Sequence, residues 1–176
     1  MHPYGFNSSQ INDILNNIQG HAGAKYVSVT HQLVRDRDFL FLSKIDEKAK
    51  SESFIISDIY HTNHLPFPLS FEKMSEVSES ELKQNEPNTI FVDADKLVFP
   101  LTLRKWEQGD FFTPFGMKGR KKVSDYFQDL KIPTHLKSHI FILESNKKIV
   151  WIVGYRMCDS LKVSKNSRNV IKIIVD

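Results

Sequence analysis

Three features are scarce or missing in this 176-residue sequence, and each one excludes a class of protein. Cys158 is the single cysteine, so the chain forms no internal disulfide, and a reducing, cytoplasmic setting is expected. The apolar runs are far too short to span a bilayer, so no membrane is predicted as a partner. No charged start precedes an apolar core and a small-residue cleavage site, so a secretory signal is not supported.

Motifs that carry phosphate chemistry or metal binding are also missing. The sequence has no Walker-type phosphate loop and no Gly-x-Gly-x-x-Gly pattern. Two histidine pairs have a spacing that suits a metal on a helix, His61 with His64 and His135 with His139. Neither pair has a third ligand nearby in the sequence, so surface or capping roles are preferred and no metal site is predicted.

Asp93, Asp95 and Cys158 are the remaining candidates for chemistry. The two aspartates would share one face of a strand, but a turn in which they accept backbone hydrogen bonds is the preferred interpretation. Arg156 could lower the pKa of the Cys158 thiol, yet a lone cysteine is usually a small buried side chain. We therefore predict no catalytic residue in this chain.

The charge is distributed unevenly along the chain. Hydrophobic residues make up 40% and charged residues 26%, as in a folded domain. Residues 1–96 hold 9 Lys and Arg against 14 Asp and Glu, a net −5, whereas residues 97–176 hold 15 against 7, a net +8. This asymmetry predicts two units with different roles, of which the second is the candidate for a polyanion-binding surface. Charge alone leaves open that the lysines only keep the domain soluble.

The first 88 residues predict one helix followed by strands. Ser9 is placed to cap a helix over 11–18, and Gly20 is placed to end it. The charged run 35–38 predicts a turn, and the acidic, serine-rich run 72–88 predicts an edge segment, a loop or a linker. Partial alternation of apolar residues predicts extended segments at 26–34, 39–42, 53–59 and 68–71.

The remaining residues, 89–176, predict a domain dominated by strands. Val123, Phe127 and Leu130 have helical spacing, which predicts a helix over 121–130. Residues 144–148 suit a hairpin turn. Apolar runs predict strands at 89–92, 140–143, 149–153 and 170–175, and an extended segment at 97–103 that is broken at Pro100. The chain is therefore predicted to be α+β and β-rich, with units at 1–88 and 89–176.

The stretch 104–133 is the most informative part of the sequence. Six basic residues lie between Arg104 and Lys122, threaded with aromatics and glycines. Gly116-Met117-Lys118-Gly119 exposes backbone amides between two flexible points, and three further cations precede the predicted helix, whose N-terminus carries partial positive charge. Such a loop suits a phosphate of an RNA backbone. A glycine turn on a solvated lysine surface remains the alternative.

A second basic group, formed by Arg156, Lys162, Lys165 and Arg168, follows the predicted strand at 149–153. It would lie on the same face as the loop if the last strands return beside that loop. Trp106, Phe111, Phe112 and Phe115 could stack on an unpaired base, although core roles are preferred for most of them. The predicted RNA contacts of both groups are Arg104, Lys118, Arg120, Lys121, Lys122, Arg156, Lys162, Lys165 and Arg168.

Several short motifs between residues 90 and 176 carry a family resemblance through their order and spacing. They are Asp93-Ala94-Asp95-Lys96-Leu97, Leu103-Arg104-Lys105-Trp106, Gly109-Asp110, Phe115-Gly116-Met117-Lys118-Gly119, Lys122-Val123-Ser124-Asp125, Lys131-Ile132-Pro133 and Ile149-Val150-Trp151-Ile152-Val153-Gly154-Tyr155-Arg156. In this order they resemble the C-terminal part of tRNA(Ile)-lysidine synthases. Residues 4–60 more loosely resemble the segment that precedes that domain.

The resemblance implies a fold and an activity for a longer parent enzyme. It implies a layered β-sandwich-like domain similar to a domain of the phenylalanyl-tRNA synthetase β-subunit, preceded by a helix and a β-hairpin segment. The parent would use ATP and Mg to ligate lysine to the wobble cytidine of the CAU anticodon of tRNA(Ile). The family's Ser-Gly-Gly-x-Asp-Ser loop is absent here, so the chain resembles the tRNA-recognition part, inactive alone and without its own cofactor.

The resemblance also implies partners, and it leaves other functions open. The expected partners are tRNA(Ile) with a CAU anticodon, the missing N-terminal catalytic domain and a possible second copy of the chain. The main alternative is a protein-interaction or dimerisation module without RNA binding, which would use an apolar patch at Phe111, Phe112 and Phe115. A weaker alternative is a free-standing enzyme that uses Asp93, Asp95 or Cys158.

Overall fold

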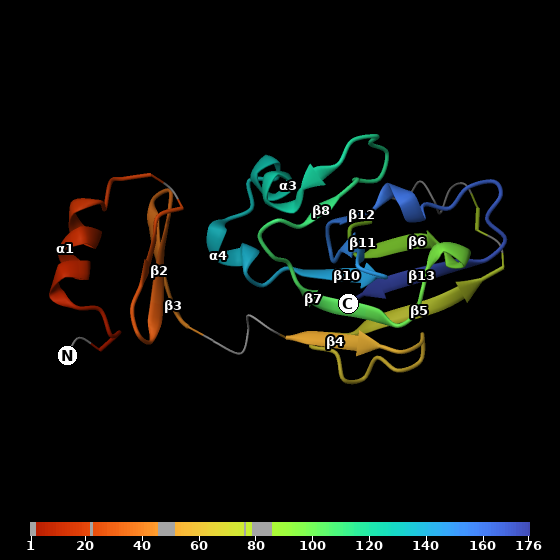
Figure 1. Cartoon of the computed structure of the whole chain (residues 1–176), viewed down its shortest axis with the longest axis horizontal. Coiled ribbons are helices and arrows are strands. Elements are labelled where there is room, and N and C mark those ends of the chain that lie inside the picture. Colours follow the sequence, from red (N-terminus) through yellow and green to blue (C-terminus); the bar gives the residue numbers. More distant parts are fainter. Residues whose placement is uncertain (1–2, 22, 46–51, 76, 79–85) are drawn as a thin grey trace. The chain divides into compact units, whose positions relative to one another are not determined.

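The computed structural model describes residues 3–21, 23–45, 52–75, 77–78 and 86–176. The chain divides into two compact units (Figure 1). Unit 1 comprises Met1–Ser51 and Leu130–His139, and unit 2 comprises Glu52–Asp129 and Ile140–Asp176. The boundary predicted at 88/89 therefore differs from the one that the contacts define. The net charge of the sequence changes from negative to positive near residue 96, which suggests a boundary there. The contacts differ because β4 and β5, which precede residue 88, pair with β7 and β13 of unit 2.

Unit 1 contains a short helix, a small antiparallel sheet and a helical turn contributed by 130–139. The sheet has the order β1-β2-β3. Thr134 donates its backbone N–H to the Asp36 carboxylate at 2.9 Å, and the His135 ring stacks on Phe41 with 3.6 Å between centroids. These contacts attach the later segment to the sheet. The elements are α1 (Ser8–Asn16), β1 (Lys25–Val27), β2 (His31–Asp36), β3 (Phe39–Lys44) and α4 (Thr134–Lys137).

Local hydrogen bonds set the ends of these elements. Asn7, rather than Ser9, caps α1: its side chain accepts from the Gln10 N–H at 2.9 Å, while the Gln10 side chain accepts from the Asn7 N–H at 3.0 Å. The predicted extended segment 26–34 is interrupted between β1 and β2 by a turn. Ser28, which is buried, accepts the His31 N–H there at 2.9 Å.

Unit 2 is built from two antiparallel sheets. The larger has the order β12-β11-β10-β7-β4 and the smaller β5-β13-β6. The predicted segment 97–103 becomes a strand only from Leu101, after a cis peptide bond between Phe99 and Pro100. The strands are β4 (Ser53–Ile56), β5 (Leu69–Met74), β6 (Thr89–Asp93), β7 (Leu101–Lys105), β10 (Phe141–Ser145), β11 (Lys148–Ile152), β12 (Arg156–Met157) and β13 (Val170–Val175).

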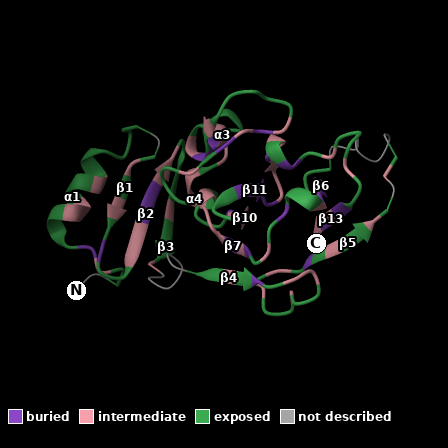
Figure 2. Ribbon diagram, turned by 45° about the vertical axis from the view of Figure 1, so that its right-hand side comes forward, coloured by how far each residue is buried: buried purple, intermediate pink, exposed green. Residues whose placement is uncertain are grey.

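The core of unit 2 lies between its two sheets. One buried cluster takes side chains from both, including Leu103 of β7, Leu143 of β10, Val92 of β6 and Ile173 of β13. In Figure 2, purple marks buried residues on β13 in this core and, within unit 1, on β2. The predicted β-rich, α+β fold class is confirmed, and the two packed sheets give the layered arrangement that the family resemblance implied.

The outer face of the larger sheet is covered as well. Helix α3 (Val123–Asp129) buries Val123 and Phe127, and Phe127 meets Trp106 edge to face with 5.1 Å between ring centroids. The short pair β8 (Phe111–Phe112) and β9 (Lys121–Lys122) leads into this helix. Strand β11 is therefore buried on both faces, and Trp151 and Ile152 are fully buried.

No helix in the described part of the chain has the length and apolar character needed to cross a bilayer. The longest helix, α1, has nine residues, whereas a spanning helix needs about 20.

Replacing Trp151 tests the core directly. Trp151→Ala is expected to lower the free energy of unfolding by about 3–5 kcal/mol, because it leaves a cavity between tightly packed layers. Chemical denaturation of the variant measures this loss. Tyr60→Ala serves as the control because Tyr60 is 75% exposed, and it should leave stability unchanged. A loss below about 1 kcal/mol for Trp151→Ala would contradict the burial described here.

Candidate nucleic-acid interface

Residues 116–120 form a loop that carries Lys118 and Arg120, here called the basic loop. The residues just before it are hydrogen-bonded to the chain that follows β11. Phe115 donates its N–H to the Met157 carbonyl at 3.0 Å, and Asp159 donates its N–H to the Thr113 carbonyl at 2.8 Å. The Gly116 N–H donates to Asp159 Oδ1 at 2.9 Å. We call this pairing of residues 113–116 with 156–159 the seam. It gives the loop a defined place on unit 2.

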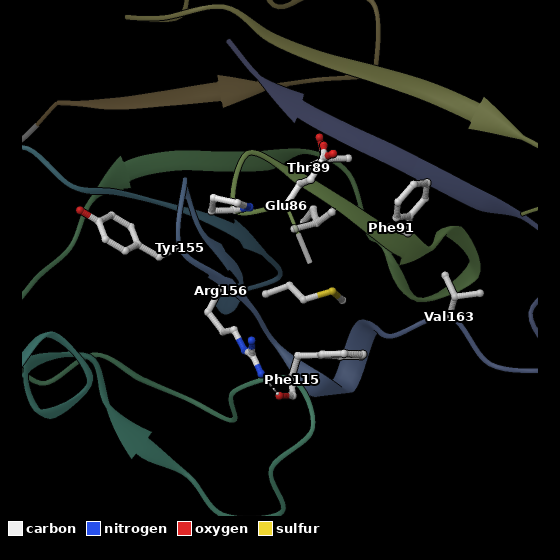
Figure 3. A pocket seen from close by; sticks show the side chains of 10 residues that line it. Glu86, Thr89, Phe91, Phe115, Tyr155, Arg156 and Val163 are labelled. Atoms are coloured by element: carbon white, nitrogen blue, oxygen red, sulfur yellow. Dashed lines mark hydrogen bonds between the residues drawn. The ribbon is translucent and has the colours of Figure 1, made fainter. Parts of the chain in front are cut away.

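The seam also brings together cations that lie about 40 residues apart in the sequence. Arg156 Nη2 donates to the Phe115 carbonyl at 2.9 Å, drawn as a dashed line in Figure 3. Lys162 Nζ donates to both Asp159 carboxylate oxygens, at 3.1 and 2.9 Å. Asp159 Oδ1 therefore holds Gly116 and Lys162 together. The expected proximity of the second basic group to the loop is met for Arg156 and Lys162.

Asp159 stays ionised because of the groups that it binds. The Lys162 ammonium and the Gly116 N–H hold the pKa of Asp159 below its ordinary value of 3.8, and they outweigh the opposing effect of burial. The stabilisation from these bonds is therefore complete above that ordinary value and is lost as the pH falls through the lowered pKa of the folded state. The seam is intact at neutral pH.

Three cations of the loop region are exposed: Lys118, Arg120 and Lys122. The Arg120 guanidinium carbon lies 5.0 Å from the centroid of the Phe111 ring, which is 41% exposed. This contact limits the conformations of the Arg120 side chain while leaving the guanidinium at the surface. Among the described residues, no carboxylate forms an ion pair with any of these three cations.

Lys121 occupies a different environment from its neighbours. It belongs to β9, where it pairs with Phe112, and its ammonium group forms an ion pair with Asp129 of α3. The helix predicted over 121–130 begins only at Val123, so Lys121 and Lys122 precede it in a short strand rather than in a free loop. Lys121 has part of its charge neutralised in place, so its predicted RNA contact is weaker than that of Lys122.

Arg104 has a structural role in this geometry. Its guanidinium donates to both Asp110 oxygens at 3.0 and 2.8 Å, to Glu144 at 2.5 Å and to the Lys105 carbonyl at 2.9 Å. The Arg104 side chain is 19% exposed. Burial tends to lower its pKa, but the two carboxylates raise it more, so Arg104 remains charged. Few N–H groups remain for a phosphate, and the predicted RNA contact of Arg104 is not supported by this arrangement.

Lys165 and Arg168 are exposed on the loop that leads into β13. The loop is held by the Ser167 hydroxyl, which donates to the buried Asp93 carboxylate at 2.7 Å. Burial acts to raise the pKa of Asp93, but hydrogen bonds from Ser167, from Lys96 and from the Asp95 N–H lower it below its ordinary value. No described contact joins Lys165 or Arg168 to the basic loop.

The aromatic residues divide into core and surface, largely as preferred from the sequence. Phe112 is 3% exposed and packs edge to face on Tyr126, with 5.3 Å between centroids. Trp106 packs on Phe127. Phe111 is at the surface, and Phe115 is half-buried beside Arg156, whose guanidinium carbon lies 5.9 Å from the Phe115 centroid. Phe111 and Phe115 thus leave part of their rings accessible, and Trp106 is half-buried as well.

The residues weighed for catalysis have local roles. Asp93 caps the turn η2 (Ala94–Lys96), as the sequence predicted, and Asp95 accepts from the Asn169 side chain at 3.0 Å. Cys158 is buried, with Sγ 3.3 Å from Ser160 Oγ. Over the described residues, no three His, Cys, Asp or Glu side chains are grouped so as to hold a metal ion.

Sequence reasoning missed the residues that hold the cations in place. Asp159 was not singled out, although its spacing of three from Lys162 was a signal for a local pair. Asp110 and Glu144 gave no such signal, because Glu144 reaches Arg104 only across the β7–β10 pairing. Strand register decides that contact.

Family models match both units. The model described as the TilS substrate binding domain matches residues 1–45, and the model described as the TilS substrate C-terminal domain matches residues 101–173. A crystal structure of a TilS C-terminal domain superposes with a TM-score of 0.58 at 21% identity, covering 71% of this chain and 97% of that one. The structural match shows that unit 2 has the β-rich fold of a TilS C-terminal domain.

Curated relatives give the family. The chain is 38% identical over 168 residues to tRNA(Ile)-lysidine synthase of Parabacteroides distasonis and 33% identical over 171 residues to that of Bacteroides thetaiotaomicron. These matches cover 96% and 97% of this chain, but only 38% and 37% of the relatives. The chain belongs to the tRNA(Ile)-lysidine synthase family and spans under two fifths of the length of these members.

A fragment of the phenylalanyl-tRNA synthetase β-subunit from Pyrococcus horikoshii also aligns with the chain. It covers 49% of the chain at 15% identity, with a TM-score of 0.40. This is the kind of domain that the sequence resemblance named, but a likeness at this level carries no argument about the fold. The fold assignment rests on the TilS domain.

Arg104→Ala separates a structural role from a binding role. The variant is expected to lower the free energy of unfolding by about 3 kcal/mol, because two largely buried carboxylates lose their partner. Arg104→Lys should recover little of this loss, since an ammonium cannot reproduce the forked contacts with Asp110 and Glu144. Chemical denaturation measures both, with the exposed Lys147→Ala as control. Under conditions in which each variant is folded, its RNA affinity should equal that of the wild type. A marked loss of affinity under those conditions would show that Arg104 contacts RNA.

Proposed function

We propose that this chain is the tRNA-recognition region of a tRNA(Ile)-lysidine synthase. The observation that carries the proposal is the seam, because it assembles cations from two parts of the sequence on one surface of the domain that matches the TilS substrate C-terminal model. The names of the relatives supply the substrate class. Lys and Arg neutralise phosphates and release counterions, so this surface suits a polyanion such as tRNA.

The cations divide into contacts and supports. Lys118, Arg120 and Lys122 are exposed without a carboxylate partner among the described residues, so they are the first candidates for backbone phosphates. Arg156 and Lys162 flank them across the seam, each already making one fixed interaction. A phosphate that approaches Gly116–Gly119 would meet cations of the loop and, across the seam, Arg156 and Lys162. Lys165 and Arg168 would extend the surface only if the RNA continues past η3 (Asp159–Leu161).

In the parent enzyme, this surface would act at a distance from the reaction. The parent is proposed to use ATP and Mg to join lysine to the wobble cytidine of a CAU anticodon in tRNA(Ile). Contacts between this region and the tRNA body would position the anticodon in a separate catalytic domain and help to select the correct tRNA. The chain itself lacks the Ser-Gly-Gly-x-Asp-Ser loop, so we expect it to turn over no ATP.

Binding to two tRNAs across a salt series tests the proposal. The chain should bind unmodified tRNA(Ile) with a CAU anticodon and prefer it over elongator tRNA(Met) with the same anticodon. Affinity should fall steeply with salt, because each neutralised phosphate releases counterions. Lys118→Glu with Arg120→Glu should weaken binding by at least about tenfold and lower the slope of log affinity against log salt by about 1 per lost contact.

A matched charge reversal controls for net charge. Lys147→Glu with Lys148→Glu changes the charge equally on the turn between β10 and β11 and should leave affinity nearly unaltered. Equal losses for both double variants would mean a non-specific electrostatic attraction. If the chain binds no tRNA at low salt, and instead self-associates in a salt-insensitive way, the dimerisation module becomes the better account.

The direction in which Asp159→Ala changes tRNA affinity shows whether Asp159 positions the loop or acts only through its charge. Asp159→Ala removes a negative charge from a basic surface, which by charge alone should raise tRNA affinity. Because Asp159 holds Gly116 and Lys162, we expect affinity to fall and amide exchange at Gly116 to accelerate. Asp125→Ala, an exposed carboxylate of α3, provides the matched control and should leave affinity equal or higher. A rise in affinity for Asp159→Ala would show that the seam does not position the contacts.

A further inference from the structure

A pocket lies beside the seam and shares Phe115 and Arg156 with it. The pocket has a volume of about 80 Å³. Its walls come from β6 and the residues just before it, from Phe115, from β12 with the preceding Tyr155, and from Val163 after η3. Figure 3 shows the side chains that line it. Those that matter for its chemistry are Phe91, Phe115, Tyr155, Arg156, Met157 and Val163.

The walls suit a flat, apolar ring system with a charge on one side. Phe115 is half-buried, so its ring is partly available, and the Arg156 guanidinium carbon lies 5.9 Å from its centroid. The hydrogen bond to the Phe115 carbonyl occupies one guanidinium N–H group of Arg156. Aromatic rings and guanidinium planes are the surfaces on which unpaired RNA bases stack, and the remaining N–H groups can donate to a phosphate.

The surroundings favour a nucleotide over an uncharged ligand. Phe115 is followed directly by the loop that carries Lys118 and Arg120, and Lys162 precedes Val163. Glu86 also lines the pocket, and Figure 3 shows it on the side away from Arg156. A carboxylate repels phosphate but accepts hydrogen bonds from an exocyclic amine of a base. The charges therefore suit a phosphate near Arg156 and a base edge near Glu86.

The pocket, at about 80 Å³, is larger than a water site, which needs about 10–15 Å³, and smaller than a cavity of about 150 Å³ that encloses a benzene ring, so a base would enter it by one edge. Base pairing decides whether that edge is available. Paired bases are stacked within a duplex, and proteins read duplex RNA mostly through its shape and backbone. Only a base that is free of pairing can leave its stack and enter a protein pocket.

We propose that this pocket is a subsite for one unpaired nucleotide of the bound RNA, with its base against Phe115 and its phosphate on Arg156. The inference rests on the proposed function, since the remaining phosphates would lie on the basic loop. It adds a contact that depends on a base being unpaired, whereas the loop contacts depend on charge. The subsite would thus read the single-stranded part of the substrate.

Filling the pocket without changing charge tests the subsite. The 176-residue chain is titrated with a single-stranded oligocytidylate and with a blunt RNA duplex that has no unpaired nucleotide. Val163→Trp should weaken oligocytidylate binding about tenfold, because one stacked base contributes about 1–3 kcal/mol and 1.4 kcal/mol is tenfold. Duplex binding and the salt slope should stay unchanged. Val98→Trp, at a 52% exposed position outside the pocket, is the matched control.

A second variant removes the stacking ring and keeps the apolar volume. Phe115→Leu should reproduce the selective loss of oligocytidylate binding, whereas Phe39→Leu, at a 67% exposed phenylalanine of β3, should not. If both pocket variants fold, as judged by thermal unfolding, and bind oligocytidylate as the wild type does, the subsite is overturned. Wild-type binding of the duplex but not of oligocytidylate also overturns it and leaves the proposed function standing. Absence of all RNA binding overturns both.

Discussion

One carboxylate organises the basic surface of this chain. Asp159 accepts the Gly116 N–H and the Lys162 ammonium, and the neighbouring backbone bonds join 113–116 to 156–159. Without this seam, a loop that contains Gly116 and Gly119 would pay a large conformational entropy to present its cations in one geometry. Because the seam forms when the domain folds, the loop loses this entropy on folding and not on binding. The cations are therefore arranged before any ligand arrives, which lowers the ordering cost of binding.

The same domain uses its positive charges in two distinct ways. Arg104 lies at the edge of the core and is surrounded by Asp110 and Glu144, so its charge is matched within the protein and joins β7, β10 and the turn before β8. Lys118, Arg120 and Lys122 lie at the surface, and no carboxylate among the described residues neutralises them. A buried cation needs partners because desolvation is costly, whereas an exposed cation can keep its charge for an external anion. Burial, and not sequence proximity, separates the two groups.

This division supports a recognition role that depends on both charge and shape. Phosphate contacts fix the position of a nucleic acid but carry no sequence information, whereas contacts with bases or with unpaired segments distinguish one RNA from another. The exposed cations supply the first kind of contact. The proposed nucleotide subsite at Phe115, Arg156 and Met157 would supply the second. Such remote contacts would serve the proposed function, because binding energy away from a reacting group can orient that group.

The sequence by itself determined the local elements and the family. Alternation and apolar runs predicted β6, β10, β11 and β13 nearly to the residue, because a strand buried on one or both faces must carry that pattern. The ordered motifs from Asp93 to Arg156 predicted the family that the relatives confirm. The unit boundary that the contacts define differs from the predicted one at 88/89, and the bonds of Arg104 and Asp159 join segments that lie far apart in the sequence. Only the tertiary structure decided these, since strand pairing brings Glu144 to Arg104 and Gly116 to Asp159, and no local pattern records which distant carboxylate a cation will find.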